Sequence, residues 1–275
     1  MDTKFTRFIK AFFIILSFLG LNILIDALSG AFVPLLILSL IDGMINLTDG
    51  ADGGPVEYMI YALLAGQVVK AICLYFFIKK RKKTFNDKYQ SPYIKNEKID
   101  RPVRFVGIGL GTVGFGLMLT NLIMKLLEGT TILDSAKELM QNAFNAQGPI
   151  QGIVLIIVII LGAPLVEELL FRGVLFEELA RIVSVKTTII LTALIFGLYH
   201  FNVLQTPNTI VMGLVLAYVY HKTKSIKAPI IIHATNNLLA IIPFIDQGLT
   251  PVGFAIDILF LLIGIYCLKT LRQKA

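Results

Sequence analysis

The chain has 275 residues, of which 56% are hydrophobic and 16% are charged, and its mean hydropathy is +0.79. This composition excludes an ordinary soluble domain, because apolar stretches of about 20 residues recur and each could cross a hydrocarbon core roughly 30 Å thick. The formal net charge of +7 does not indicate a nucleic-acid-binding protein. Its basic residues lie in the loops and at both chain ends, which is typical of cytoplasmic membrane-protein loops.

In chain order, these stretches predict an all-α fold, a polytopic transmembrane helical bundle with about eight membrane-spanning helices. The expected helices cover residues 8–29, 56–79, 104–127, 150–183, 187–202, 208–221, 228–245 and 251–269.

Loop charges orient the predicted helices. Residues 79–104 hold ten Lys or Arg against three acids, so we expect this loop in the cytoplasm. Residues 31–45 are apolar but short, and a crossing there would place that basic loop outside. We therefore expect an interfacial or re-entrant segment at 31–45, with both termini in the cytoplasm.

The predicted helix 150–183 contains VEELLFRG at residues 166–173, with two glutamates and an arginine inside an apolar run. One ionisable residue at the centre of a membrane helix costs about 2.5–3.5 kcal/mol on insertion scales. Glu168 and Arg172 are spaced i and i+4, so their side chains can pair. Glu167 points about 100° away, so its partners should come from other helices. The Gly-Ala-Pro sequence at 162–164 predicts a kink just before it.

Two of the three histidines in the chain lie inside predicted apolar helices. His221 stands beside lysines at a helix end, where we expect a capping or solvated role. Phe196 precedes His200 by one helical turn, and Asn237 follows His233 by one turn on the same face. A lone membrane histidine often only links two helices by a hydrogen bond. Two of them, one with a neighbouring asparagine, favour a functional cluster.

Helix lengths predict that these groups share one depth. Glu167 and His200 stand at nearly equal distances on either side of the turn 184–186, at about 1.5 Å per helical residue. His233 and Asn237 lie about 9–15 Å beyond the next basic loop by the same measure. The predicted site is therefore in the cytoplasmic half of the membrane.

The residue types indicate hydrolytic chemistry. A carboxylate beside an imidazole can deprotonate a water, and an imidazole with a carboxamide can donate hydrogen bonds to an oxyanion. Together they suit hydrolysis of a peptide bond. The alternative is a zinc site, for which Glu167, His200 and His233 would be ordinary ligands.

Three short motifs, EELLFRG (167–173), FGLYH (196–200) and HATNN (233–237), resemble those of the CPBP family of CAAX prenyl endopeptidases, Abi proteins and bacteriocin-processing enzymes. The resemblance covers about residues 150–245. It implies an eight-helix intramembrane endopeptidase that opens toward the cytoplasm. The family has been described both as metalloproteases and as glutamate-dependent proteases, and the second description suits a Glu-plus-His water site better. On this resemblance we expect no metal or other cofactor, with zinc as the alternative.

The resemblance also implies a role for each motif residue. Glu167 would activate the attacking water, His200 would share that water, and His233 with Asn237 would form the oxyanion hole. The supporting residues would be Glu168, Arg172 and Phe196.

The resemblance divides the chain into N-terminal transmembrane helices (1–149), a catalytic core (150–245) and a C-terminal helix with a basic tail (246–275). We expect a multi-pass bacterial cell-membrane protein, with the bilayer and a peptide or lipidated protein as partners and no nucleic acid. Peptide maturation, bacteriocin immunity or regulated proteolysis would be its role. The alternative is a noncatalytic membrane regulator or scaffold of the same family.

Overall fold

The computed structural model describes residues 4–27, 55–86, 99–143, 148–242 and 250–271, and in these ranges it is a bundle of helices without strands. The predicted segment 31–45 lies outside the described residues. The helical bundle confirms the predicted all-α membrane fold.

Most helices lie where the apolar stretches predict them. Those of the first half are α1 (Lys4–Ala27), α3 (Pro55–Asn86), α4 (Val103–Leu126) and α5 (Thr131–Ala143). The long helix 149–179 is built from α6 (Pro149–Ile157), a π-helical segment η2 (Val158–Gly162), α7 (Ala163–Leu170), a second π segment η3 (Phe171–Phe176) and α8 (Glu177–Leu179). The remainder are α9 (Val185–Leu198), α10 (Thr206–Thr223), α11 (Lys227–Ala240) and α12 (Pro251–Lys269).

Three boundaries differ from the prediction. Helix α3 continues through residues 79–86, which were expected to be loop, because Lys and Arg are good helix formers and no Gly or Pro interrupts them. Helix α9 ends at Leu198 and Phe201 takes a left-handed φ of 46°, so His200 lies in a turn just beyond the helix. Helix α11 ends at Ala240, five residues before the predicted end.

Helix α5 was not predicted. It is amphipathic, and its apolar side packs Leu133 and Ala136 against Leu204. The Asn202 side chain also donates a 3.0 Å hydrogen bond to the Ala136 carbonyl. A short helix with an exposed polar side lacks the long apolar run by which the other helices are found.

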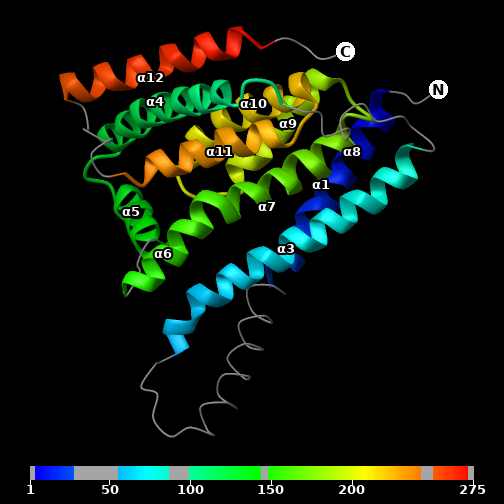
Figure 1. Ribbon diagram of the computed structural model, residues 1–275, viewed down its shortest axis with the longest axis horizontal. Helices are drawn as coiled ribbons and strands as arrows, with labels where there is room; N and C mark the ends of the chain where they lie inside the picture. The colour runs from blue at the N-terminus through cyan, green and yellow to red at the C-terminus, as the bar shows by residue number, and fades with distance from the viewer. Residues whose placement is uncertain (1–3, 28–54, 87–98, 144–147, 243–249, 272–275) are drawn as a thin grey trace, which may run out of the picture.

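The helices form a bundle in which neighbours run in both relative directions: α4/α12 and α9/α10 are antiparallel, while α4/α11 and α3/α7 are parallel (Figure 1). Helix α12 packs along α4, α4 along α11, and α9 along α10, while α3 packs against α6 and α7. Gly111 and Gly264 let α4 and α12 approach closely, because a Cβ atom built on Gly111 would stand 2.6 Å from the Gly264 Cα. This close approach fixes α4 between α12 and α11.

Basic side chains gather at one end of the array. Helices α1, α4, α9 and α11 begin there, and α3, α8, α10 and α12 end there (Figure 1). The cations on these helix ends and turns include Lys4, Arg7, Lys79, Lys80, Arg101, Arg104, Arg181, Lys186, Lys222, Lys224, Lys227 and Lys269. We call this the basic end.

Among the described helices, three are long and apolar enough to cross a membrane by length and composition: Val103–Leu126, Pro149–Leu179 and Pro251–Lys269. Helix α9 is apolar but shorter. The number of crossings, expected to be eight, stays a prediction.

Candidate active site

The long helix 149–179 carries the EELLFRG motif between its two π segments. Gly162 and Pro164 predicted a kink here, and the structure has the wider π turn at Val158–Gly162, where the Ala163 N–H bonds to the Val158 carbonyl five residues earlier. With the same spacing of five residues, the Ile159 carbonyl would accept from the N–H of residue 164, but residue 164 is a proline and has no N–H. The Ile159 carbonyl therefore lacks a backbone partner in the helix.

Asn237 supplies the missing donor. Its Nδ2 group donates a 2.9 Å hydrogen bond to the Ile159 carbonyl, which ties α11 to the π turn. π-Helical turns of this kind are frequent at functional sites. Part of the Asn237 amide is thus used for structure, and one N–H of Nδ2 is left for another acceptor.

The centre of the site is a buried ion pair. Arg172 Nη1 donates to Glu168 Oε1 at 2.9 Å, and both side chains have 0% exposure. Arg172 Nη2 also donates to the Gly213 carbonyl of α10 at 3.1 Å, and the guanidinium lies 4.8 Å from the centre of the Phe196 ring. The pairing predicted from i,i+4 spacing is confirmed, and it reaches two further helices.

His233 of α11 joins the two glutamates. Its Nδ1 atom lies 2.9 Å from Glu168 Oε1, and its Nε2 atom lies 3.8 Å from Glu167 Oε2. Because a carboxylate accepts, His233 donates from Nδ1 when Glu168 is ionised, which fixes the orientation of the ring. The 3.8 Å separation on the other side is too long for a direct hydrogen bond. Glu167 thus has its partner on another helix, as predicted.

Phe196 brings the histidines together. Its ring is fully buried and makes edge-to-face contacts with His200 at 5.2 Å and with His233 at 5.7 Å between ring centres. Its backbone carbonyl accepts a 2.9 Å hydrogen bond from His200 Nδ1. That bond requires the proton on Nδ1, so Nε2 of a neutral His200 is an acceptor.

The structure does not pair His200 with Glu167. In the described part of the chain no hydrogen bond or ion pair links them, whereas His233 is the imidazole beside Glu167. The five residues Glu167, Glu168, Arg172, Phe196 and His233 form a contiguous cluster, which we call the Glu–His cluster, with His200 stacked at its edge and Asn237 one turn from His233 on α11.

The arrangement of the side chains does not decide the alternative of a zinc ion. Within the described ranges no group of three or more His, Cys, Asp or Glu side chains gathers as metal ligands do. Whether Glu167, His200 and His233 ever bind zinc together stays a prediction to be tested.

Sequence reasoning missed two backbone acceptors and one side-chain contact. The Gly213 and Ile159 carbonyls carry no side-chain signal in the sequence. Gly213 could have indicated a close approach of α10 to α9, because a Cβ at this position would stand 3.2 Å from the Phe196 ring. The contact between Glu168 and His233 joins residues 65 positions apart, and no local spacing predicts it.

Comparisons with known proteins find relatives of this part of the chain. Residues 149–239 match the family described as "Type II CAAX prenyl endopeptidase Rce1-like", and the match contains every residue of the Glu–His cluster. The chain is 29% identical over 121 residues to the "Putative membrane peptidase YdiL" of Bacillus subtilis, covering 41% of this chain and 49% of that protein. It is 36% identical over 85 residues to the "Membrane-embedded CAAX protease MroQ" of Staphylococcus aureus, covering 29% of this chain and 34% of that protein. The matches thus span about half or less of these relatives. No solved structure matches the chain significantly.

Proposed function

We propose that the chain is an intramembrane endopeptidase whose attacking water is activated by Glu167, and the premise is the match of residues 149–239 to the Rce1-like CAAX protease family. The observation that carries the proposal is the buried sequence of contacts from Arg172 through Glu168 and His233 to Glu167. Charged side chains inside an apolar helix cost free energy, so they are expected either to be fully paired or to serve a function. Three atoms of these contacting side chains, Glu167 Oε2, Glu168 Oε2 and Arg172 Nε, have no hydrogen-bond partner in the described residues. Of these three side chains only Glu167 is partly exposed, at 19%, so it is the one that a water and a substrate can reach.

Glu167 is the general base in this proposal. Its Oε2 atom faces His233 Nε2 at 3.8 Å, and a water beside both atoms can bond to each. Transfer of one water proton to Glu167 leaves a hydroxide to attack the carbonyl carbon of the peptide bond. Glu167 then returns that proton to the leaving amine as the C–N bond breaks.

The role of His233 depends on its proton. When neutral and donating from Nδ1 to Glu168, His233 accepts at Nε2 and helps Glu167 to hold the water. When cationic, it donates from both nitrogens, and Nε2 can stabilise the oxyanion together with the free Asn237 N–H. His200, whose Nε2 atom is an acceptor in the neutral form, is the second candidate for sharing the water.

The proposed substrate is a peptide bond near the C-terminus or in the leader of a membrane-associated peptide or lipidated protein. The proposed location is a bacterial cell membrane, with the basic end and both termini in the cytoplasm. Loss of catalytic groups would give the alternative function, a noncatalytic regulator, but all four proposed catalytic residues are present at Glu167, His200, His233 and Asn237.

The experiment that tests this function compares peptides from cells that carry the wild type, Glu167→Gln or His221→Ala at matched levels. His221 is a matched control because it lies at the end of α10, outside the cluster. We expect cleavage products with wild type and His221→Ala and none with Glu167→Gln, which removes the base while keeping the side chain's shape. The noncatalytic regulator would instead be supported if the peptides were identical in the wild type and both variants, and if cells with Glu167→Gln still behaved like wild-type cells and unlike cells without the protein.

A further inference from the structure

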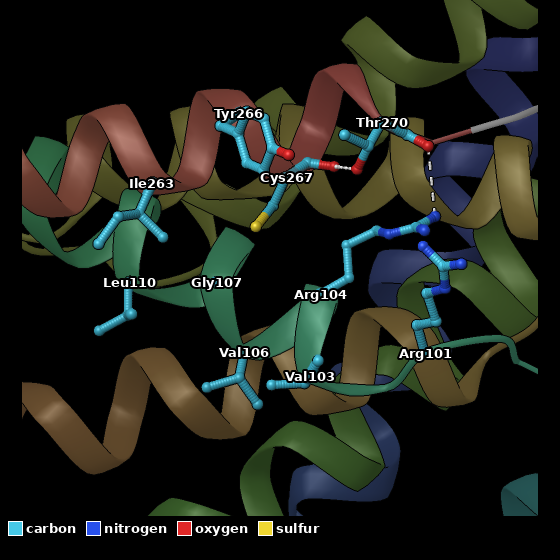
Figure 2. A pocket seen from close by; sticks show the side chains of 10 residues that line it. All are labelled: Arg101, Val103, Arg104, Val106, Gly107, Leu110, Ile263, Tyr266, Cys267 and Thr270. Atoms are coloured by element: carbon cyan, nitrogen blue, oxygen red, sulfur yellow. Dashed lines mark hydrogen bonds between the residues drawn. The ribbon is translucent and has the colours of Figure 1, made fainter.

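A groove opens between the start of α4 and the end of α12, far along the chain from the Glu–His cluster (Figure 2). It has a volume of about 400 Å³, within the range of small-ligand sites. Its lining residues are Arg101, Val103, Arg104, Val106, Gly107, Leu110, Ile263, Tyr266, Cys267 and Thr270. Helix α4 separates it from α11, because Gly109 on the other side of α4 faces Thr235.

The groove is apolar along its length and cationic at its mouth. Leu110 and Ile263 line the part deeper along α4, while Arg101 and Arg104 stand beside the end of α12 (Figure 2). No acidic residue is among the lining residues. A lipid fits this groove, because its apolar tail matches the apolar wall and its anionic head matches the two arginines at the mouth.

One of the two arginines is held in place by a backbone carbonyl, and the other stands at a strained backbone position. Arg104 Nη1 donates to the Thr270 carbonyl at 3.3 Å, which leaves its Nη2 and Nε groups for another acceptor. Arg101 takes a left-handed φ of 50°, a conformation that costs a non-glycine residue roughly 1 kcal/mol or more. Guanidinium groups match the paired oxygens of a phosphate. Strained residues of this kind recur at ligand clamps.

The mouth of the groove belongs to the basic end of the bundle. Val103 and Tyr266 are 75% and 71% exposed there. Exposed aliphatic groups suit the edge of the hydrocarbon core, and tyrosine suits the headgroup layer. The cytoplasmic leaflet, which basic loops face, has a negative surface potential from its anionic lipids.

We propose that the α4/α12 groove binds one anionic phospholipid, with its phosphate between Arg101 and Arg104 and an acyl chain along Leu110 and Ile263. A free phosphate would use only the mouth and leave the apolar wall empty, so the lipid is the occupant that uses both parts. Binding here is separate from peptide hydrolysis and does not depend on the Glu–His cluster.

The test titrates delipidated full-length protein with phosphatidylglycerol or phosphatidylcholine of the same acyl chains and counts bound lipid by native mass spectrometry. We expect one tightly held phosphatidylglycerol and weaker phosphatidylcholine. The double substitution Arg101→Gln/Arg104→Gln should weaken phosphatidylglycerol binding about 30-fold, since each basic side chain at an anionic surface contributes about fivefold. Lys125→Gln, which removes an exposed cation from the opposite end of α4, should bind like the wild type.

Three further arms separate the alternatives. Leu110→Trp should reduce binding of both lipids because it fills the apolar part. Arg101→Lys/Arg104→Lys, which keeps the charge, should bind with intermediate affinity and serves if the glutamine variant does not fold. Millimolar inorganic phosphate should not displace the lipid. Unchanged phosphatidylglycerol binding by either arginine variant, equal binding of the two lipids, or displacement by phosphate would overturn the proposal.

Discussion

The buried guanidinium of Arg172 explains how two glutamates are accommodated in an apolar helix. It donates to Glu168 and to the Gly213 carbonyl and lies over the Phe196 ring. Groups from three helices therefore contact its charge. Glu168 in turn accepts from Arg172 and meets His233. Arg172 and Glu168 therefore hold His233 in position, and Glu167 is the member of the cluster left to react.

Removal of one partner of this pair should destabilise the protein more than removal of both. Arg172→Leu leaves the Glu168 carboxylate buried without its cation, for which a loss of about 3–5 kcal/mol is expected. Glu168→Leu/Arg172→Leu should lose less, because no unpaired charge remains. Unfolding of the purified variants by sodium dodecyl sulfate in mixed micelles would measure both. A double variant as unstable as Arg172→Leu, or less stable than it, would contradict this expectation.

The same residues bear on the metal question. Glu167 and His233 adjoin, and the family resemblance favours a water site of Glu and His over a metal site. We therefore expect 1,10-phenanthroline to leave peptide cleavage by purified protein unchanged. The control is a zinc peptidase inhibited under the same conditions. Inhibition of this protein that added zinc reverses would establish the zinc alternative.

At the scale of one helix, the π turn leaves a carbonyl without a donor and Asn237 supplies that donor. Pro164 removes the N–H that the Ile159 carbonyl would accept, and Asn237 replaces it from α11. This contact positions α11, and with it His233, against the glutamates. Asn237 thus has a structural task that is separable from its proposed catalytic one.

A pair of substitutions can separate the two tasks of Asn237. Asn237→Leu should lower stability by about 1 kcal/mol, because the part-buried Ile159 carbonyl loses its donor. Adding Pro164→Ala should restore much of that stability, because the new N–H can bond to Ile159. Peptide cleavage should stay low in the double variant if Asn237 donates to the oxyanion. Stability and cleavage that recover together would assign Asn237 a structural role alone.

Across the whole molecule, local features could be predicted and long-range contacts could not. The pairing of Glu168 with Arg172 follows from helical spacing, and the helices follow from apolar runs. The contacts of His233 with Glu168 and of Asn237 with Ile159 join residues 65 and 78 positions apart, so they depend on how helices pack. The assignment of the water to Glu167 and His200 came from family resemblance, and the structure places His233 nearer to Glu167.

The gathering of cations at one end of the bundle predicts how the whole molecule sits in the membrane. Positive loops face the cytoplasm, so the turn between α8 and α9 should be inside and the turn between α4 and α5 outside. A background of Cys73→Ser/Cys267→Ser removes the two cysteines. Lys186→Cys and Glu128→Cys then place one exposed thiol at each end. Lys186→Cys spares the Ser184 side chain that caps α9.

A membrane-impermeant maleimide applied to intact cells should label Glu128→Cys and should label Lys186→Cys only after the membrane is permeabilised. The Glu–His cluster lies on helix 149–179, α9 and α11. The same result would place the basic end of these helices and the opposite end of α4, on which α11 packs, on known sides of the membrane. Labelling of Lys186→Cys in intact cells would reverse the orientation. It would also move the Arg101 and Arg104 groove to the outer leaflet, where its anionic lipid would have to be sought instead.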